Sequence, residues 1–442
     1  MHVIIIGAGE VGYELAESIR RKGHDITIID KDERACQRVR NLDIKVIKGN
    51  GVKPELLNSL DIKSCDFFFA VTDDNETNLV TCAMAKSAGC TTIARINGLE
   101  YINTPVSKRF NKIGVDYAVS PEMIIAQEIS NIISVPSAIN MNISLSGNIN
   151  ILEFKILEHS KVEGKKLKNI RLPSKVNLGG IIREKTVLVP HGDTVLKEGD
   201  TLIVMTGGKS EVRQMMKLIG KKRRKVTSVM VVGATDIGIN VAKILEKRGM
   251  RVVLLEASST NARRAAEKLK DTEVIVGDAR DKKILIEEGI LRVDAFASTT
   301  RSEEFNVLVS LLAKIYGVEK TIAIVKELGL KSLIETVGID MAASPQLQTA
   351  RTMLRLARDL NPLKAISFHG GDLYLLETIV EEDSNVIGRK LEDIALPAGT
   401  LVGAVVRGRG TIIPHGETVI KQGDKVMIFV LKDDIRKVEE IF

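Results

Sequence analysis

A glycine-rich turn near the N-terminus has the residue types and spacing of a phosphate-binding loop. It reads Gly7-Ala8-Gly9-Glu10-Val11-Gly12. In such a turn the first glycine permits the sharp bend, the second lets the backbone approach a diphosphate, and the third lets helix and strand pack closely. Backbone N–H groups at the start of the following helix face the phosphates, and the helix dipole favours their negative charge. The turn therefore predicts a nucleotide site.

An acidic residue follows at the spacing of a ribose contact. Asp30 ends the apolar run 26–29 and lies 18 residues after Gly12, close to the ~20 found in dinucleotide-binding units. A carboxylate there accepts hydrogen bonds from both ribose hydroxyls and repels a 2′-phosphate. It favours NAD or an adenosine di- or triphosphate over NADP. The alternative interpretation is a glycine turn that binds no ligand. A strand before the turn, a helix after it and the acidic residue together make this alternative much weaker.

The elements around the turn predict how these residues are positioned. His2–Ile6 is rich in β-branched residues, typical of a buried strand, and Tyr13–Ile19 has apolar residues at helical spacing. Predicted strands and helices then alternate as far as a helix over 122–134, which indicates an α/β fold with a doubly wound parallel sheet. Ligands bind beyond the carboxyl ends of such strands. This rule brings together Gly7–Val11, Asp30, Asn50, Gly51, Thr72, Asp73 and Arg95.

Two members of this set have an equally simple structural explanation. The planar fork of Arg95 suits phosphate oxygens, but it could also form a surface ion pair. The segment from Thr72 to Asn75 suits ligand contact, but it also suits the N-cap of a helix starting near Asn75. Cap and ligand contact are compatible, so both interpretations stay open.

The second half of the chain repeats the first. Val229–Gly238 matches the opening 226 residues later, Glu256 stands in the place of Asp30, and Pro190–Asp200 matches Pro414–Asp424. A duplication predicts two Rossmann-like lobes, each followed by a small α+β lobe. The predicted boundaries are 1–135, 136–220, 226–358 and 359–442. The basic run Lys221–Lys225 is then an exposed linker.

Composition limits the class of protein. The 442 residues are 44% hydrophobic and only 3% aromatic, so the cores are aliphatic and disorder is not expected. We expect no membrane span and no signal peptide, because no apolar run is long enough.

The four cysteines (Cys36, Cys65, Cys82 and Cys90) lack metal-ligand spacing and suit a reducing cytosol. The net charge of +7 suits an acidic partner or an anionic membrane face. Recognisable DNA- or RNA-binding motifs are missing, so no nucleic-acid partner is predicted.

Residue patterns for catalysis are not found. The sequence has six histidines and lacks the serine-hydrolase, Walker-lysine and cysteine–histidine signatures. His191 and His415 lie in matching turns without a second ligand nearby, so no metal site is predicted. An NAD-dependent oxidoreductase would need a residue that transfers a proton beside the nicotinamide, and neither small lobe offers one. The sequence predicts a nucleotide sensor that is not an enzyme, with the oxidoreductase as the alternative.

The chain resembles the peripheral nucleotide-binding subunit of Trk-type potassium uptake systems, which carries two tandem regulator-of-potassium-conductance (RCK) units. The resemblance covers essentially the whole sequence, and the tandem arrangement is its most specific feature. The motifs that carry it are the glycine turn with Asp30, the segments Thr72–Asn78 and Ile93–Ile96, and Leu396–Gly408.

This resemblance implies a cytosolic ring, commonly a homotetramer, docked at the inner face of the membrane beneath a potassium-translocating subunit. It implies NAD(H) as ligand, ATP or ADP as alternatives in the same crevice, and gating of transport by the bound species. Regulation of another cation transporter is a further alternative. The implied contacts are Gly7, Ala8, Gly9, Glu10 and Val11 with phosphate, Asp30 with ribose, Asn50, Gly51, Thr72 and Asp73 with adenosine, and Arg95 with phosphate or a second nucleotide.

Two positions depart from the family pattern. Asn97 stands where a second arginine often follows the one matching Arg95, which weakens contact with a terminal phosphate. Thr235 replaces the middle glycine of the second turn and crowds the approach of a diphosphate. The second site would comprise Gly233, Ala234, Thr235, Asp236, Ile237, Glu256, Gly277, Asp278 and Thr299. An occupied second site and a degenerate lobe kept for ring assembly stay open as alternatives.

Overall fold

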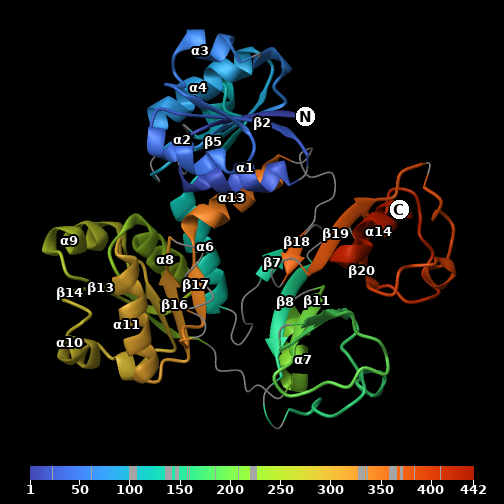
Figure 1. The fold of residues 1–442 in the computed structure, drawn as a ribbon. Helices are drawn as coiled ribbons and strands as arrows, with labels where there is room; N and C mark the ends of the chain where they lie inside the picture. Colours follow the sequence, from blue (N-terminus) through green and yellow to red (C-terminus); the bar gives the residue numbers. More distant parts are fainter. Residues whose placement is uncertain are drawn as a thin grey trace. The chain divides into compact units, whose positions relative to one another are not determined.

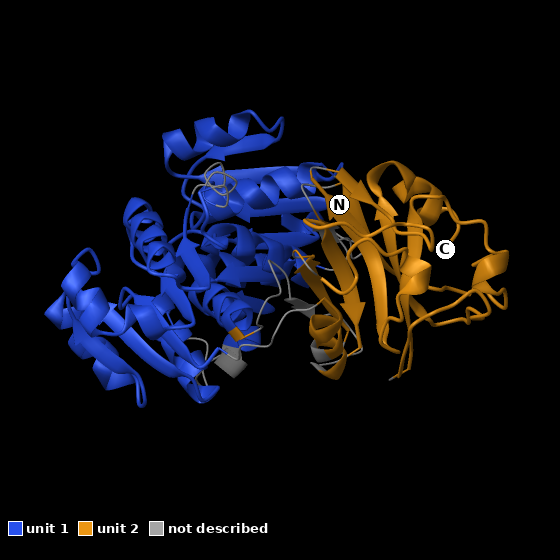
Figure 2. Cartoon of the chain, turned by 90° about the horizontal axis from the view of Figure 1, so that it is seen from below, with its two compact units in different colours: residues 1–133, 226–361 blue, residues 134–225, 362–442 orange. Residues whose placement is uncertain are grey.

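In the residues that it describes, a computed structural model of the chain contains four sheets, two of six strands and two of five (Figure 1). It describes all residues except 22, 61, 99–106, 135–141, 145–148, 157, 159, 185, 208, 220–225, 327–333, 335–336, 358–365, 369–371, 383 and 409. The predicted linker and most of the predicted lobe boundaries lie outside the described residues. Two compact units are present, residues 1–133 with 226–361 and residues 134–225 with 362–442 (Figure 2).

The first lobe of unit 1 is the predicted doubly wound sheet. Its strands run in the order β3-β2-β1-β4-β5-β6 and all pair in parallel. The strand order reverses at β1, so the crevice beside β1 is the topological switch point where ligands bind in such sheets. The elements are β1 (His2–Ile6), α1 (Glu10–Arg20), β2 (Asp25–Asp30), α2 (Glu33–Arg40), β3 (Lys45–Lys48), α3 (Pro54–Asn58), β4 (Phe67–Ala70), α4 (Asn75–Ser87), β5 (Thr91–Arg95), β6 (Tyr117–Val119) and α6 (Pro121–Ser134).

The second lobe of unit 1 repeats this arrangement, with the order β14-β13-β12-β15-β16-β17 and parallel pairing throughout. The predicted duplication of the Rossmann-like fold is therefore confirmed. The elements are β12 (Ser228–Val232), α8 (Asp236–Lys247), β13 (Arg251–Glu256), α9 (Ser259–Lys268), β14 (Glu273–Val276), α10 (Lys282–Glu287), β15 (Ala295–Ser298), α11 (Glu303–Ile315), β16 (Lys320–Ile324), β17 (Met341–Ala343) and α13 (Pro345–Leu356).

The two lobes of unit 1 exchange their last helices. Ile125 and Ile129 of α6 are buried in the core of the second sheet, whereas Met353 of α13 is buried in the core of the first. Side chains of the second lobe also cap α6: Arg248 Nη1 donates to Ser130 O at 2.7 Å and Lys320 Nζ to Ile132 O at 2.6 Å. Cations at a helix C-terminus satisfy its free carbonyls. Each sheet is thus completed by the other half of the chain.

Unit 2 contains the two small lobes, each built on an antiparallel sheet. The sheet orders are β10-β9-β11-β8-β7 and β18-β19-β22-β20-β21. Their elements are β7 (Asn142–Ser144), β8 (Asn150–Lys155), β9 (Val176–Arg183), β10 (Thr186–Leu188), β11 (Thr201–Thr206), α7 (Lys209–Ile219), β18 (Ile366–Phe368), β19 (Leu373–Ile379), β20 (Thr400–Arg407), β21 (Gly410–Ile412), β22 (Lys425–Leu431) and α14 (Ile435–Glu439).

The two small lobes share one apolar core. Met205 of the first lobe and Phe429 of the second belong to the same buried cluster. Asn177 Nδ2 donates to Gly403 O across this boundary at 3.2 Å. Gly179 lies directly against Phe429, because a Cβ at that glycine would be 2.1 Å from the ring. Gly179 and Gly180 are both part of strand β9, and Gly179 leaves the space that the aromatic ring fills.

Candidate functional site

The carboxyl ends of five strands bring the predicted residues of the first crevice to one edge of the sheet. The glycine turn leaves β1, and Asp30 ends β2. Asn50 follows β3, Thr72 follows β4 and Arg95 ends β5. Because the strands are parallel, these positions line a single edge.

The three glycines of the first turn serve different purposes. Gly7 has a φ of +107°, and a Cβ there would lie 3.0 Å from Thr72 N. A Cβ at Gly12 would lie 1.9 Å from Gly7 O, so helix α1 reaches the turn only because this residue is glycine. Gly9 is different, since a Cβ there would meet no atom within 4 Å. The fold therefore needs Gly7 and Gly12, whereas Gly9 leaves open space at the start of α1.

The carboxylate of Asp30 is held against the turn. Its Oδ2 accepts from Ala8 N at 2.7 Å and its Oδ1 accepts from Asp32 N at 2.9 Å. Each carboxylate oxygen has about two acceptor positions, so capacity for ribose hydroxyls remains. Arg38 was missed by the sequence analysis. Its Nη2 donates to Ala8 O at 3.2 Å and its Nη1 lies 3.7 Å from Glu10 Oε1. Arg38 thus links helix α2 to the turn and stabilises it.

On the other side of the crevice Arg95 takes part in a polar network. Its Nη1 lies 2.7 Å from Asp73 Oδ1, and its Nε donates to Asn97 Oδ1 at 3.1 Å. Arg95 therefore forms an ion pair in this structure, and its contact with phosphate stays a prediction. The Arg95 side chain is 19% exposed and that of Asp73 is 92% exposed, so the pair opens to solvent on the aspartate side. The hydrogen bond to Asn97 thus helps to orient Arg95.

Asn78 organises the turn after β4. Its Oδ1 accepts from both the backbone N (3.0 Å) and the hydroxyl (2.7 Å) of Thr72, and its Nδ2 donates to Arg95 O at 2.8 Å. The sequence analysis did not single it out. A polar residue on the buried face of α4 was the available signal.

The predicted helix cap is also present, because Asp74 accepts from Thr77 N at 2.8 Å. Hydrogen bonds from Thr77 lower the pKa of Asp74.

Asn50 and Gly51 form the wall beyond β3. Asn50 Oδ1 accepts from Val52 N at 3.1 Å, which shapes the loop. A Cβ at Gly51 would lie 2.8 Å from Ile6 Cγ2, so this glycine lets the loop pack on β1.

The second turn has the same scaffold. Gly233 has a φ of +101°, and a Cβ at Gly238 would lie 2.0 Å from Gly233 O. Glu256 takes the place of Asp30, accepting from Ala234 N at 2.6 Å and from Ser258 N at 2.8 Å. Arg264 takes the place of Arg38: it donates to Ala234 O at 3.0 Å and lies 3.6 Å from Asp236.

Thr235 and Asp278 of the second crevice form hydrogen bonds within the crevice. Thr235 Oγ1 accepts from Gly238 N at 3.2 Å and donates to Thr299 O at 2.7 Å. Asp278, which follows Gly277, binds Arg280 through a contact of 2.6 Å, and this hydrogen bonding lowers the pKa of Asp278. Ile237, in the first turn of α8, is half-buried.

Thr299 lies one residue away from the counterpart of Thr72. Its hydroxyl is buried and donates to Val232 O and Gly233 O, both at 3.0 Å, so it lies beneath the turn. Thr300 instead repeats the bonds of Thr72, because its backbone N and hydroxyl meet Asn306 Oδ1 at 2.9 and 2.7 Å. The matching strand register explains the shift, since β15 aligns with β4 at Ala295 and Phe67.

The described residues contain no group of three or more histidine, cysteine or acidic side chains that could hold a metal ion. In the same part of the chain, no helix combines the length and the apolar composition needed to cross a membrane. All four cysteines are buried free thiols, and burial raises the pKa of Cys82.

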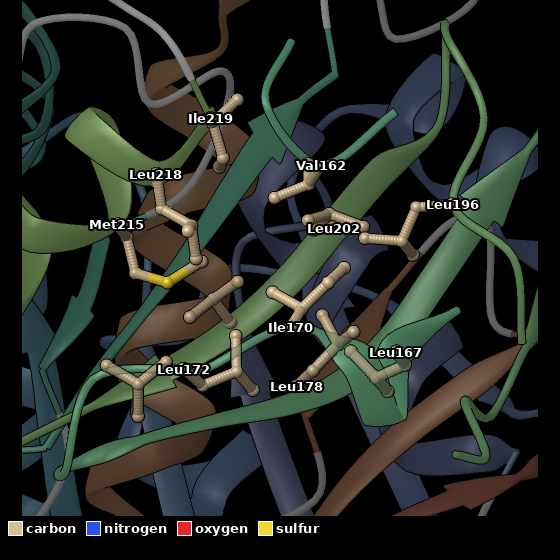
Figure 3. Close-up of a pocket in the computed structure, with 12 residues that line it drawn as sticks. Val162, Leu167, Ile170, Leu172, Leu178, Leu196, Leu202, Met215, Leu218 and Ile219 are labelled. Atoms are coloured by element: carbon tan, nitrogen blue, oxygen red, sulfur yellow. The ribbon is translucent and has the colours of Figure 1, made fainter. Parts of the chain in front are cut away.

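A small cavity lies in the first small lobe, between α7 and the strands (Figure 3). Its volume is about 10 Å³, which is the space of about one water molecule. Only apolar side chains line it, among them Leu202, Met215 and Ile219. The cavity is a packing defect of the core and is too small for a nucleotide.

Comparison with known proteins identifies both kinds of lobe. The TrkA-N domain family matches residues 3–121 and 229–345, and the TrkA-C domain family matches residues 151–220 and 375–442. Each matched range falls within one of the four predicted lobes, whose boundaries stay a prediction.

Curated relatives match over the full length. The chain is 35% identical over 451 residues to the Trk system potassium uptake protein TrkA homolog 1 of Methanosarcina mazei, covering 100% of both chains. It is 31% identical over 452 residues to the Trk system potassium uptake protein TrkA of Halomonas elongata, covering 100% of this chain and 98% of the relative.

Solved structures share the fold at low identity. The GsuK channel bound to NAD matches at 17% identity with a TM-score of 0.63, covering 100% of this chain and 78% of that chain. GsuK bound to ADP matches at 13% identity with a TM-score of 0.51, covering 82% and 69%. Tandem TrkA-N and TrkA-C domains and full-length relatives lead to one conclusion: the chain belongs to the TrkA family of Trk-system potassium uptake proteins.

Proposed function

We propose that this protein is a nucleotide-sensing regulatory subunit that binds NAD(H), or ATP or ADP, in the first crevice and gates a membrane potassium-translocating partner. The observation that carries the proposal is the first glycine turn. It combines an unobstructed helix start at Gly9 with the carboxylate of Asp30 held beside it. Phosphates suit the helix start and a ribose suits the carboxylate.

The comparisons support this choice of ligand and partner. GsuK, whose fold this chain shares, is described with NAD and with ADP. The full-length relatives are potassium uptake proteins of Trk systems. The protein then acts at the inner face of the membrane, on the cytoplasmic side, without catalysing a reaction.

The exchanged helices provide a route from the crevice to the rest of unit 1. A ligand at the turn contacts the start of α1, and Leu15 of α1 shares a buried cluster with Met353 of α13. Helix α13 belongs to the second lobe. A nucleotide that binds one conformation of α1 more tightly than another therefore shifts the conformational equilibrium of both lobes.

An exposed apolar face on the second lobe supports self-assembly into a ring. Leu308 and Ile315 of α11 are 48% and 77% exposed and lie seven residues apart, on one face of the helix. The matching helix α4 exposes Val80. Apolar side chains repeated along an exposed helix face are typical of a surface that another protein covers, and here we infer a second copy of this chain.

Two measurements test the proposed function. Isothermal titration of the purified chain with NADH, NAD, ATP and ADP should show saturable binding of at least one of them. Potassium uptake should then be measured in cells deficient in potassium uptake that co-express a Trk membrane subunit, with and without this chain. Nucleotide-dependent uptake that needs the chain supports the proposal. The proposal is contradicted if the chain binds none of these nucleotides, or if potassium uptake is the same with and without the chain.

A further inference from the structure

The two glycine turns of unit 1 have the same backbone but different side chains at the start of the helix. Gly9 has φ −64° and ψ −169°, and Thr235 has φ −71° and ψ 169°. Both residues are the N-caps of their helices, α1 and α8. The difference between the two crevices at this point is therefore the threonine side chain itself.

That side chain bonds within the turn. Thr235 Oγ1 accepts from Gly238 N, one of the N–H groups at the start of α8, at 3.2 Å. The same hydroxyl donates to Thr299 O at 2.7 Å, at the end of β15. It thus joins the helix start to the neighbouring strand across the space that Gly9 leaves open in the first lobe. An N-cap threonine supplies the oxygen that a phosphate would otherwise offer to the helix.

The rest of the second crevice is also paired internally. Arg280 binds both carboxylate oxygens of Asp278, the counterpart of Asn50, and its guanidinium lies 5.8 Å from the ring centre of Phe305. A ligand entering there would have to displace this pair as well as the threonine hydroxyl.

We propose that Thr235 closes the second crevice to diphosphate-containing nucleotides, so that the chain binds one nucleotide, in the first lobe alone. The proposal rests on the function proposed above for the first crevice. It assigns Thr235 as the residue that determines which of two duplicated lobes senses the nucleotide. The second lobe then contributes helix α13 and the apolar face of α11 rather than a ligand site.

Reciprocal substitutions test this proposal, and the structure accommodates both. Replacing an N-cap threonine by glycine costs little stability. A Cβ at Gly9 would meet no atom within 4 Å, and the φ of −64° suits any residue. Circular dichroism and thermal unfolding of Thr235→Gly and Gly9→Thr serve as checks that each variant is folded.

The measurement is the stoichiometry of NADH and ADP binding to the full chain by isothermal titration. We expect one nucleotide per wild-type chain, two per chain for Thr235→Gly, and no saturation for Gly9→Thr at concentrations that saturate the wild type. Two nucleotides per wild-type chain, or one per chain for Thr235→Gly, would overturn the assignment of Thr235. A wild-type chain that binds no nucleotide would instead overturn the proposed function, so the two failures are distinguishable.

Discussion

At the scale of single residues, the first crevice differs from its duplicate at the N-cap of the helix, which is Gly9 in the first and Thr235 in the second. Asp30 and Glu256 make equivalent bonds to their turns, at 2.7 and 2.6 Å. Only the first of these turns has an unobstructed helix start. Equivalent carboxylates are therefore expected to differ in their contribution to nucleotide binding.

Asp30→Ala is expected to weaken NADH binding by about 1–3 kcal/mol, because charged hydrogen bonds to the ribose are lost. This corresponds to roughly a 5- to 150-fold rise in Kd. Isothermal titration measures the change. Glu256→Ala is the matched control, since it removes the equivalent bond from the closed turn and should leave Kd unchanged. An unaltered Kd for Asp30→Ala would remove this residue from the site.

The buried carboxylate of Asp424 allows a test of stability, because its hydrogen bonds should contribute to the free energy of unfolding. It is buried and accepts from Arg407 Nε at 2.8 Å and from Lys421 N at 2.8 Å. Burial raises its pKa, but the hydrogen bonds from Arg407 and Lys421 outweigh burial and hold the pKa below the ordinary value. Asp424→Asn is expected to lower the free energy of unfolding at neutral pH by about 2 kcal/mol, reduced from the fully buried case because Arg407 is 35% exposed.

The effect of Asp424 should depend on pH in a defined direction. A carboxyl with a lowered pKa stabilises the fold above its unfolded pKa of about 3.9, and this stabilisation is lost as the pH falls through the folded pKa. The difference between wild type and Asp424→Asn, measured by urea unfolding, should therefore shrink as the pH is lowered from about 5 to about 3. A difference that grows over this range would contradict the assignment.

At the scale of elements, the exchanged helices α6 and α13 make each sheet of unit 1 depend on the other half of the chain. Met353 of α13 is fully buried in the core of the first sheet. Alternating strand and helix patterns predict the sheets, because each pattern is local. They do not say which sheet a terminal helix covers, since both sheets offer similar apolar faces.

Met353→Ala is expected to lower the free energy of unfolding by about 2–5 kcal/mol, because it leaves a cavity in a packed core. Hydrogen exchange should locate the loss of protection in β1 and α1 of the first lobe, although the substitution is in the second half of the sequence. Arg351→Ala, an exposed position on the same helix, should change stability by no more than about 0.5 kcal/mol. Loss of protection confined to the second lobe would argue against the exchange.

At the scale of the whole molecule, the proposed ring requires a surface that a second copy covers. The exposed apolar face of α11 is the candidate, and burying its side chains on association would provide the driving force. Lysine and aspartate, introduced there, would resist burial because an unpaired charge is costly to desolvate.

The double substitution Leu308→Asp with Ile315→Lys is therefore expected to reduce the mass of the assembly, measured by light scattering after size exclusion. Leu291→Asp is the control, because Leu291 is also exposed, at 60%, but lies outside α11. An assembly of unchanged mass in the double variant would place the interface elsewhere. Nucleotide binding to the first crevice should persist in both proteins.

Features that depend on residues close together in the chain could be predicted from the sequence. Glycine spacing defined the turn, apolar periodicity defined the strands and helices, and the internal match between halves defined the duplicated lobes. Asp30 could be assigned to the crevice because a parallel sheet brings the carboxyl ends of its strands to one edge. These inferences needed no knowledge of how distant segments pack.

Contacts between distant segments show how the duplicated lobes differ from each other and how they pack together. Helices α6 and α13 are each buried against the sheet of the opposite half, more than ninety residues away along the chain. The hydroxyl of Thr235 meets Thr299 O, which is 64 residues away, and Arg95 meets Asp73 from a different strand end. Such contacts are selected by packing and hydrogen-bond satisfaction between distant segments, so a local pattern carries no information about them.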